Sequence, residues 1–276
     1  MKVGEQTLDL SRPVAMTIVN VTPDSFFAGS RSMHIDEITM RVEEAVGWGA
    51  KIIDVGGYSS RPGAEDVSVD EEVDRVMTGV EVVRAKAPGV VVSLDTFRSE
   101  VAAKVIKRFG ACIINDISGG QIDPEIFDVA AKFRVPYILM HMRGTPKTMQ
   151  EMTDYQDIVA DVKDFFAEKI EFLRSRGVDD IILDPGFGFA KTTPQNFRLL
   201  AQLRQLQKFE LPILAGISRK SMIYNVLEST PVEALSGTAA LNWACLQGGA
   251  NILRVHDTLA AVEVIKLHNY YKNVNG

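Results

Sequence analysis

The chain has 276 residues, of which 46% are hydrophobic and 24% are charged, and its formal net charge at pH 7 is −6. This composition is ordinary for a soluble globular protein, and the negative charge argues against general nucleic-acid binding, which needs a basic face. No apolar run approaches the length of a membrane span, and the first ten residues lack the apolar core of a signal peptide. We therefore expect no membrane partner.

The sequence offers no sign of a second domain. No Pro/Gly/Ser-rich linker or low-complexity tract divides it, and a single α/β barrel can use the whole of residues 1–276. The two cysteines, Cys112 and Cys245, lie in apolar contexts and cannot make a disulfide framework. We therefore expect one domain in a reducing, cytoplasmic compartment.

Apolar runs alternate with helical patterns along the chain. After residues 3–10, which suggest a small hairpin, the near-continuous apolar runs span residues 14–19, 51–55, 90–94, 111–114, 136–140, 181–183, 211–217 and 251–253. Segments with a 3.6-residue period span residues 35–48, 69–85, 99–109, 124–133, 155–173, 194–207, 232–247 and 259–270. This alternation predicts a parallel sheet covered on both faces. Eight such units favour a single (β/α)8 TIM barrel, with an open doubly wound sheet as the alternative.

Polar residues end nearly every apolar run. Side chains at the C-terminal ends of barrel strands meet at one mouth, where the active site of this fold lies. The residues expected to converge there are Asn20, Asp95, Asn115, His141, Asp184, Lys220, Arg254 and His256. So many polar strand ends are hard to explain as caps alone.

Residues 181–192, I-I-L-D-P-G-F-G-F-A-K-T, carry the clearest of these ends. A carboxylate at the end of a buried strand, as expected for Asp184, is costly unless a partner meets it, although a loop Asp that caps the next turn is an alternative. Together, Asp95, Asn115 and Asp184 offer two carboxylates and one amide, which fit a flat ligand edge rich in N–H donors. An acid/base pair or a divalent metal site is the competing interpretation.

Two long loops add further candidates. In residues 20–26, N-V-T-P-D-S-F, the amide oxygen of Asn20 suits a hard cation such as Mg2+, with an Asx turn before Pro23 as the alternative. Residues 54–63 combine glycines and hydroxyls with Arg61, which can deliver a guanidinium to an anion or remain solvated.

The last two strand ends gather basic groups. Lys220, Arg254 and His256 suit a diphosphate, with Ser221 near a helix start, because this corner of a barrel commonly binds anions. We assign Arg219 to the surface or the scaffold. A lone histidine such as His141 is more often structural than a ligand, and the absence of a second spaced His or Cys argues against zinc.

The motifs N-V-T-P-D-S-F, G-G-x-S-x-R-P-G, S-L-D-T, I-N-D-I-S-G-G, H-M-R-G-T-P, D-P-G-F-G-F, S-R-K-S and R-V-H-D occur in this order over essentially the whole chain. In combination they resemble the dihydropteroate synthase family of folate biosynthesis. The resemblance implies a barrel that joins 6-hydroxymethyl-7,8-dihydropterin diphosphate to p-aminobenzoate, with dihydropteroate and diphosphate as products. It also implies Mg2+, a homodimer formed through the last helices, and competition by sulfonamides.

Carried over position by position, the resemblance implies a role for each site residue. The pterin would be held by Asp95, Asn115, Asp184, Lys220, Met140 and Phe189. The diphosphate would be held by Ser60, Arg61, Arg254 and His256, and Mg2+ by Asn20. The p-aminobenzoate pocket would be framed by Phe26, Ser60, Arg61, Pro62, Phe189, Lys220 and Ser221. Asp95, Lys220 and Arg61 would be the catalytic residues, with no obligatory general base.

The chain departs from the family pattern at several positions. Phe27 and Ala28 stand where an acidic residue is common, Tyr58 and Ser60 stand where Glu and Thr are usual, and Ala190 replaces a glycine, which predicts mild stiffening. Two alternative functions therefore stay open: a non-catalytic pterin-binding paralogue, and a pterin-dependent methyltransferase domain. A methyltransferase would have no need for S-R-K-S, R-V-H-D or the arginine loop, all of which this chain has.

Overall fold

The computed structural model describes residues 1–21, 31–59 and 66–275. Its main sheet is made of β3 (Val14–Asn20), β4 (Ile52–Gly56), β5 (Val91–Asp95), β6 (Ile113–Asp116), β7 (Tyr137–Met140), β8 (Ile181–Asp184), β9 (Leu214–Ala215) and β10 (Ile252–Val255). The strands are parallel, in the spatial order β8-β7-β6-β5-β4-β3-β10-β9. A parallel bridge between Leu183 and Ile213 joins the two ends of this order. The predicted barrel is confirmed, and the open-sheet alternative is wrong.

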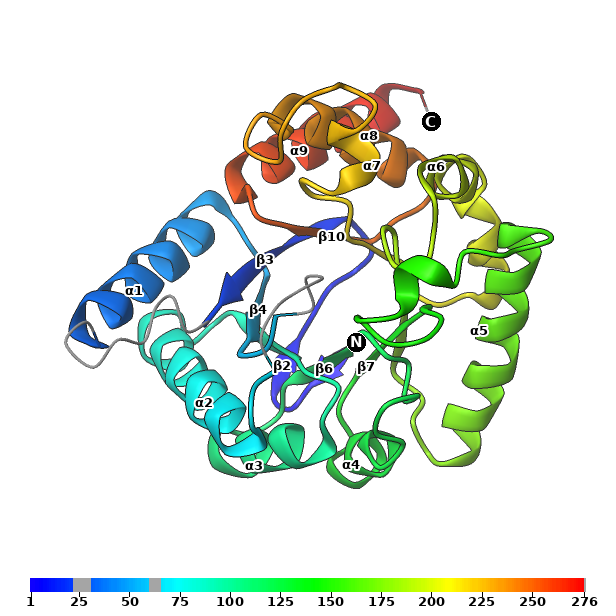
Figure 1. Ribbon diagram of the computed structural model, residues 1–276. Helices are drawn as coiled ribbons and strands as arrows, with labels where there is room; N and C mark the ends of the chain where they lie inside the picture. The colour runs from blue at the N-terminus through cyan, green and yellow to red at the C-terminus, as the bar shows by residue number, and fades with distance from the viewer. Residues whose placement is uncertain (22–30, 60–65, 276) are drawn as a thin grey trace.

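Helices surround this sheet (Figure 1). They are α1 (Arg31–Trp48), α2 (Val69–Lys86), α3 (Ser99–Phe109), α4 (Ile126–Phe133), α5 (Ile158–Ser175), α6 (Thr193–Ala201), α7 (Ser221–Tyr224), α8 (Leu235–Gln247) and α9 (Thr258–Asn275), with short 3-10 turns η2 (Met149–Glu151) and η3 (Leu203–Phe209). Within the described residues, no helix is long and apolar enough to cross a membrane.

The interior of the barrel is apolar at the amino-terminal ends of the strands. One buried cluster joins inward-facing strand residues, among them Met16, Ile52 and Ile182, to Val3 and Leu8 of the N-terminal segment. The predicted hairpin is present there as β1 (Lys2–Val3) and β2 (Gln6–Thr7). It therefore plugs this end of the barrel and leaves the opposite mouth as the place for polar chemistry.

Two predicted elements are clearly shorter than expected. The helix expected over 194–207 ends at Ala201, where Gln202 takes φ −113° and ψ 15°, and the chain continues as η3. Its start is well specified, because Thr192 and Gln195 form a capping box. The strand expected over 211–217 pairs regularly only at Leu214 and Ala215.

Candidate functional site

The two-residue period of the strands sorts their side chains between the barrel interior and the helices. Ile52, Val91, Ile113, Ile138, Ile182 and Ile252 belong to the inner apolar cluster. Side chains on one face of a strand recur every second residue, so two or four positions later the same inner side carries Asp54, Asp95, Asn115, Met140, Asp184 and Arg254. The register brings Asp95 opposite Asn115, and Met140 opposite Asp184.

Arg254 of β10 links the carboxylates of two other strands. Its Nε donates to Oδ2 of Asp54 at 2.6 Å, and its Nη2 donates to Oδ2 of Asp95 at 2.5 Å. Oδ2 of Asp54 also accepts a hydrogen bond from Nδ2 of Asn115 at 3.0 Å. One network therefore fixes three of the predicted site residues, Asp95, Asn115 and Arg254.

This network holds two carboxylates and a single guanidinium. Burial raises the pKa of Asp95 to about 7, the charge of Arg254 opposes the rise, and the nearby Asp54 carboxylate adds to it. Asp54 is fully buried, and its Oδ1 has no hydrogen-bond partner among the described residues. Oδ1 of Asp54 is thus an acceptor that no donor among the described residues meets.

Asp184 ends β8 and is 6% exposed. Its Oδ1 accepts the backbone N–H of Gly186 at 2.7 Å. Burial raises the pKa of Asp184, and the positive charges of Lys220, Arg254 and Lys191 oppose that rise. These three cations therefore supply the counter-charge that the buried Asp184 carboxylate requires.

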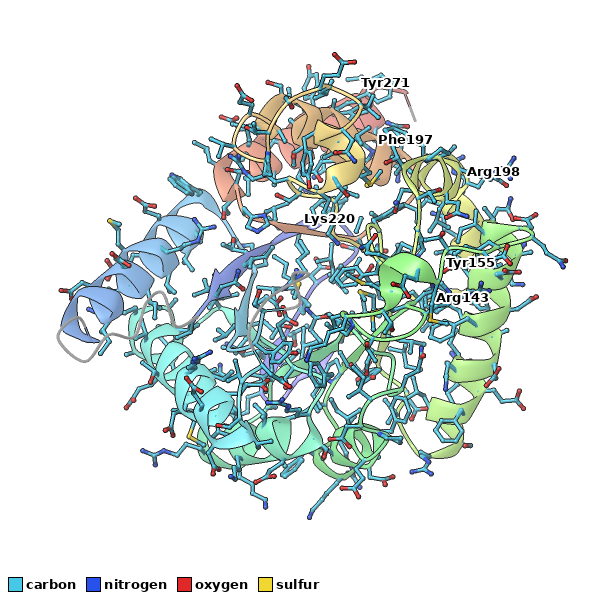
Figure 2. All side chains as sticks on the ribbon, viewed as in Figure 1. Arg143, Tyr155, Phe197, Arg198, Lys220 and Tyr271 are labelled. Carbon is cyan, nitrogen blue, oxygen red and sulfur yellow. The ribbon has the colours of Figure 1, made fainter. Side chains whose placement is uncertain are left out.

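Lys220 precedes α7 and is half-buried (Figure 2). Its Nζ donates to the carbonyl oxygen of Phe187 at 2.6 Å and lies 4.5 Å from the ring centroid of Phe189. Burial lowers the pKa of Lys220 to about 8, against the charge of Asp184. Gly188 takes φ 82°, and a Cβ on it would make a tight contact of 3.0 Å with Cδ of Lys220, so both the backbone and the contact favour glycine.

An apolar cluster adjoins these polar groups. It contains Met140, Phe97 and Ala190, with Tyr58 and Phe189 packed against it. Tyr58 meets the Phe97 ring edge-on at a centroid distance of 5.1 Å, so the departure at this position enlarges the apolar surface. Ala190 takes φ 50°, which costs a residue with a Cβ about 1 kcal/mol. That departure therefore adds backbone strain besides the predicted stiffening.

His256 and Asn20 lie around a shared hollow. Ile18, Glu37, Ile38 and Arg41 also line it. Nδ1 of His256 is 3.1 Å from the hydroxyl of Ser218, and its carbonyl oxygen accepts a hydrogen bond from Nη2 of Arg41 at 2.5 Å. Asn20 is exposed at the end of β3, and Ser221 is exposed at the start of α7. Both exposed side chains are accessible to a ligand.

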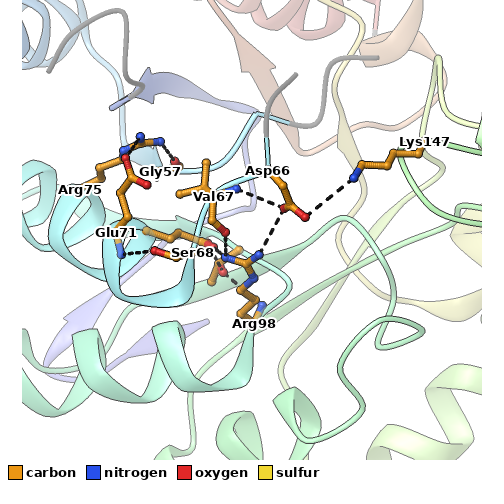
Figure 3. A network of polar contacts seen from close by, with 10 residues as sticks. Gly57, Asp66, Val67, Ser68, Glu71, Arg75, Arg98 and Lys147 are labelled. Carbon is orange, nitrogen blue, oxygen red and sulfur yellow. Dashed lines mark hydrogen bonds and ion pairs between the residues drawn. The ribbon is translucent and has the colours of Figure 1, made fainter. Parts of the chain in front are cut away.

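A polar network joins the segments that flank residues 60–65 (Figure 3). Arg98 donates to Oε2 of Glu72 and to the carbonyl oxygen of Val67, both at 2.8 Å. Glu72 is fully buried and also accepts the hydroxyl of Thr96 at 2.6 Å, while Arg75 donates to the Gly57 carbonyl at 3.0 Å. This network fixes Gly57 and Val67, which lie before and after residues 60–65.

Some of the predicted site residues lie outside the described part of the chain. Phe26, Ser60, Arg61 and Pro62, and the departures Phe27 and Ala28, fall in the ranges that the structure does not describe.

Arg219 pairs with both carboxylate oxygens of Asp257 at 2.8 Å, so it ties the loop before α7 to the loop before α9, as scaffold. No group of three or more His, Cys, Asp or Glu side chains suited to a metal ion occurs among the residues described.

Asp54 and Lys191 are among the buried charges that the sequence interpretation missed. A charge inside the apolar run I-I-D-V-G was the available signal for Asp54, because such a group needs a partner. Lys191 is 4% exposed, and its Nζ lies 3.0 Å from Nδ1 of His141. His141 is therefore an internal partner of a lysine, consistent with a structural role for this lone histidine.

Comparisons with known proteins agree with this geometry. The model of the family described as "Pterin binding enzyme" matches residues 16–256. Dihydropteroate synthase of Synechocystis sp. is 42% identical over 97% of this chain and 93% of its own, and that of Escherichia coli K12 is 44% identical over 95% and 92%.

Solved structures give the same result. The Yersinia pestis dihydropteroate synthase in a sulfonamide drug complex superposes with a TM-score of 0.90 at 40% identity, covering 99% of both chains. The Xanthomonas albilineans enzyme with 4-aminobenzoic acid gives a TM-score of 0.87 at 37% identity, covering 96% of this chain and 95% of that one. The chain therefore belongs to the pterin-binding enzyme family and, within it, to the dihydropteroate synthases.

Proposed function

We propose that the chain condenses 6-hydroxymethyl-7,8-dihydropterin diphosphate with p-aminobenzoate to give 7,8-dihydropteroate and diphosphate. The observation that carries this proposal is the meeting of Asp95, Asn115, Asp184 and Lys220 at one barrel mouth, within a chain that shares 44% identity with a dihydropteroate synthase. The Xanthomonas albilineans relative is described with 4-aminobenzoic acid, which supports the second substrate.

The pterin ring would sit between polar and apolar surfaces. Its edge of N–H donors would face the oxygens of Asn115 and Asp184, both almost fully buried. Its faces would contact Met140 and Phe189, which share one apolar cluster. Lys220, which donates to the Phe187 carbonyl, would also donate to an acceptor atom of the pterin ring.

The diphosphate would be bound by Arg254 and His256, together with Ser60 and Arg61 of the second loop. Asn20 would hold Mg2+, because one exposed amide oxygen suits a cation that takes its other ligands from phosphates and water. Asn20 and His256 line the same hollow, which supports placing the cation beside the diphosphate. Mg2+ bound there would neutralise charge on the leaving group.

The residues of the chain would then act by charge and position. The aniline nitrogen of p-aminobenzoate attacks the methylene carbon of the pterin, the carbon–oxygen bond to diphosphate breaks, and one proton leaves the nitrogen. Positive charge that develops on the pterin-methyl group would be stabilised by the Asp95 carboxylate. Since the aniline is neutral at pH 7, orientation by Phe26, Pro62, Phe189 and Ser221 would dominate, and no general base is assigned.

We infer further that the protein is a homodimer in the cytoplasm. Leu267, Tyr270, Tyr271 and Val274 are exposed on α9 at helical spacings of three and four residues, and they form an apolar stripe of the kind that marks an interaction surface. Cys112 and Cys245 are free and buried, which supports a reducing compartment.

The product identifies the reaction. Purified protein would be incubated with pterin diphosphate, p-aminobenzoate and Mg2+, and the mixture analysed by mass spectrometry. We expect dihydropteroate, with the amino nitrogen of p-aminobenzoate joined to the pterin methylene. Pterin binding without this product would favour the non-catalytic paralogue instead.

A further inference from the structure

Lys191 is a buried ammonium group that the proposed reaction does not use. It follows the loop of residues 185–190 and immediately precedes Thr192, the N-cap of α6, where a lysine would ordinarily be solvated. Instead its side chain is directed inward and is 4% exposed. An ammonium group at such a position is costly unless its donors are satisfied.

Backbone oxygens of the loop satisfy those donors. Nζ of Lys191 donates to the carbonyl oxygens of Gly186 and Phe189, each at 2.9 Å. It is also 3.0 Å from Nδ1 of His141 and 3.3 Å from the His141 carbonyl oxygen, at the end of β7. The ammonium therefore joins both ends of the loop to a neighbouring strand.

Other groups hold the backbone N–H groups of the loop: Gly186 donates to Oδ1 of Asp184 and Gly188 to Oδ1 of Asn196, both at 2.7 Å, and Phe189 donates to the Gly186 carbonyl at 3.1 Å. Lys191 acts on the carbonyl side, at Gly186 and Phe189. Gly186, Gly188 and Ala190 have φ values of 67°, 82° and 50°, so every second residue is left-handed and no regular ladder of hydrogen bonds can form. The Phe187 carbonyl of this loop accepts a hydrogen bond from Nζ of Lys220 at 2.6 Å, and the ring centroid of Phe189 lies 4.5 Å from the same nitrogen. The place of Lys220 thus depends on the conformation of this loop.

We propose that Lys191 is a positioning residue, whose ammonium holds the loop of residues 185–190 in the conformation that places Lys220 and Phe189 against the substrates. This proposal rests on the proposed function, since it concerns the same site. Lys191 does not touch the substrates in this account, and it acts through Phe187 and Phe189.

Both cations and a carboxylate surround Lys191. Burial lowers the pKa of Lys191 to about 7, and the charge of Asp184 opposes that change while those of Lys220 and Arg143 add to it. Burial also lowers the pKa of His141, so its Nδ1 can accept a hydrogen bond from the ammonium. Arg143 lies 3.8 Å over the Tyr155 ring, and that ring in turn packs against His141 at a centroid distance of 6.0 Å (Figure 2).

A double-mutant cycle tests the proposal. Lys191→Met keeps the length of the stem and removes the ammonium, Lys220→Met removes the group that the loop holds, and the third variant combines both. The dissociation constant for pterin diphosphate, kcat and the KM for p-aminobenzoate would be measured for each. Lys163→Met, which removes a lysine on α5 that donates to Gln205 at 2.9 Å, is the control and should behave like the wild type.

We expect Lys191→Met to lower kcat/KM by about 100-fold, as a displacement of about 1 Å in a site can do. The double variant should be no more than about threefold worse than Lys220→Met, because the effects of coupled residues do not multiply. Effects that multiply, or a wild-type kcat/KM in Lys191→Met, would overturn the proposal.

Two further measurements keep the outcomes distinct. If Lys191→Met does not fold, Lys191→Gln retains N–H donors for the loop carbonyls, and it should keep more activity than Lys191→Ala in the same assay; equal activities would refute the role. If the wild type forms no dihydropteroate, the proposed function fails instead. In that case the affinity for the pterin substrate alone decides whether Lys191 positions its site.

Discussion

Arg254 and Asp95, which stand 159 residues apart in the sequence, meet at the barrel mouth with Nη2 2.5 Å from Oδ2. The same guanidinium holds Asp54 through Nε at 2.6 Å. Because a guanidinium can donate in two directions at once, a single residue holds the buried Asp54 carboxylate and the half-buried Asp95 carboxylate in place.

Arg254→Lys should therefore lower the activity, although it keeps the positive charge. A lysine ammonium can reach one carboxylate but lacks the planar fork, so the other carboxylate would lose its partner. We expect diphosphate release to be about 100-fold slower, measured as kcat/KM with both substrates. The matched control is Arg176→Lys in the exposed pair with Asp128, which should keep the wild-type rate; an equal loss in both would contradict this account.

The raised pKa of Asp95 should appear in the pH dependence of stability. Because burial lifts this pKa to about 7 in the folded protein, the folded state holds a proton that the unfolded chain has already lost. The corresponding stability is present at low pH and is lost as the pH rises through about 4 to about 7, by up to about 1.4 kcal/mol per pH unit.

Asp95→Asn removes this contribution. Denaturant unfolding of the wild type and the variant, measured from about pH 5 to about pH 8, should show the difference moving in favour of the variant as the pH rises. Asp116 and Asp184 also have raised pKa values, but they are common to both proteins and cancel in the comparison. A difference that does not change with pH would show that Asp95 is ionised throughout.

Glu71 and Glu72 allow a test of the polar network that includes Gly57 and Val67. Both pair with an arginine, but the side chain of Glu71 is 52% exposed and that of Glu72 is fully buried. Glu72→Ala should lower the free energy of unfolding by about 3–5 kcal/mol, because it leaves Arg98 without its buried counter-charge. Glu71→Ala should cost less than about 1 kcal/mol. Similar losses in the two variants would refute the distinction.

Much of the fold and the main site residues could be predicted from the sequence. The apolar runs marked each strand, and their polar ends marked the mouth, because a parallel barrel buries both faces of its strands and directs their carboxyl ends the same way. This pattern predicts Asp95 and Asn115 on neighbouring strand ends, and the register places them as direct partners.

The partners of the buried charges could not be predicted in this way. Asp54 is visible in the sequence as a charge in an apolar run, but its partner Arg254 lies 200 residues later. Lys191 precedes a capping box and has the sequence context of a solvated residue. The inward direction of its side chain could not be predicted, because it depends on a loop with alternating left-handed residues. The end of the sixth helix at Ala201 likewise follows from a backbone change at Gln202 that no proline or glycine announces.

The apolar stripe on α9 predicts the assembly. Leu267→Glu places a charge among exposed apolar side chains, so it should convert a dimer to a monomer in sedimentation-velocity experiments without changing the far-UV circular dichroism. Glu263→Gln, on the preceding turn of the same helix, is the control and should remain dimeric. A wild type that sediments as a monomer would contradict the dimer.

The most direct measurement is diphosphate release by wild type, Asp184→Asn and Lys220→Ala, with pterin diphosphate and Mg2+, in the presence and absence of p-aminobenzoate. We predict release by the wild type that depends on p-aminobenzoate, and a loss of about 100-fold or more in each variant while the unfolding transition stays cooperative. Wild-type rates in either folded variant would contradict the assignment of the barrel mouth as the pterin site. Tight pterin binding by the wild type without any release would contradict the synthase itself.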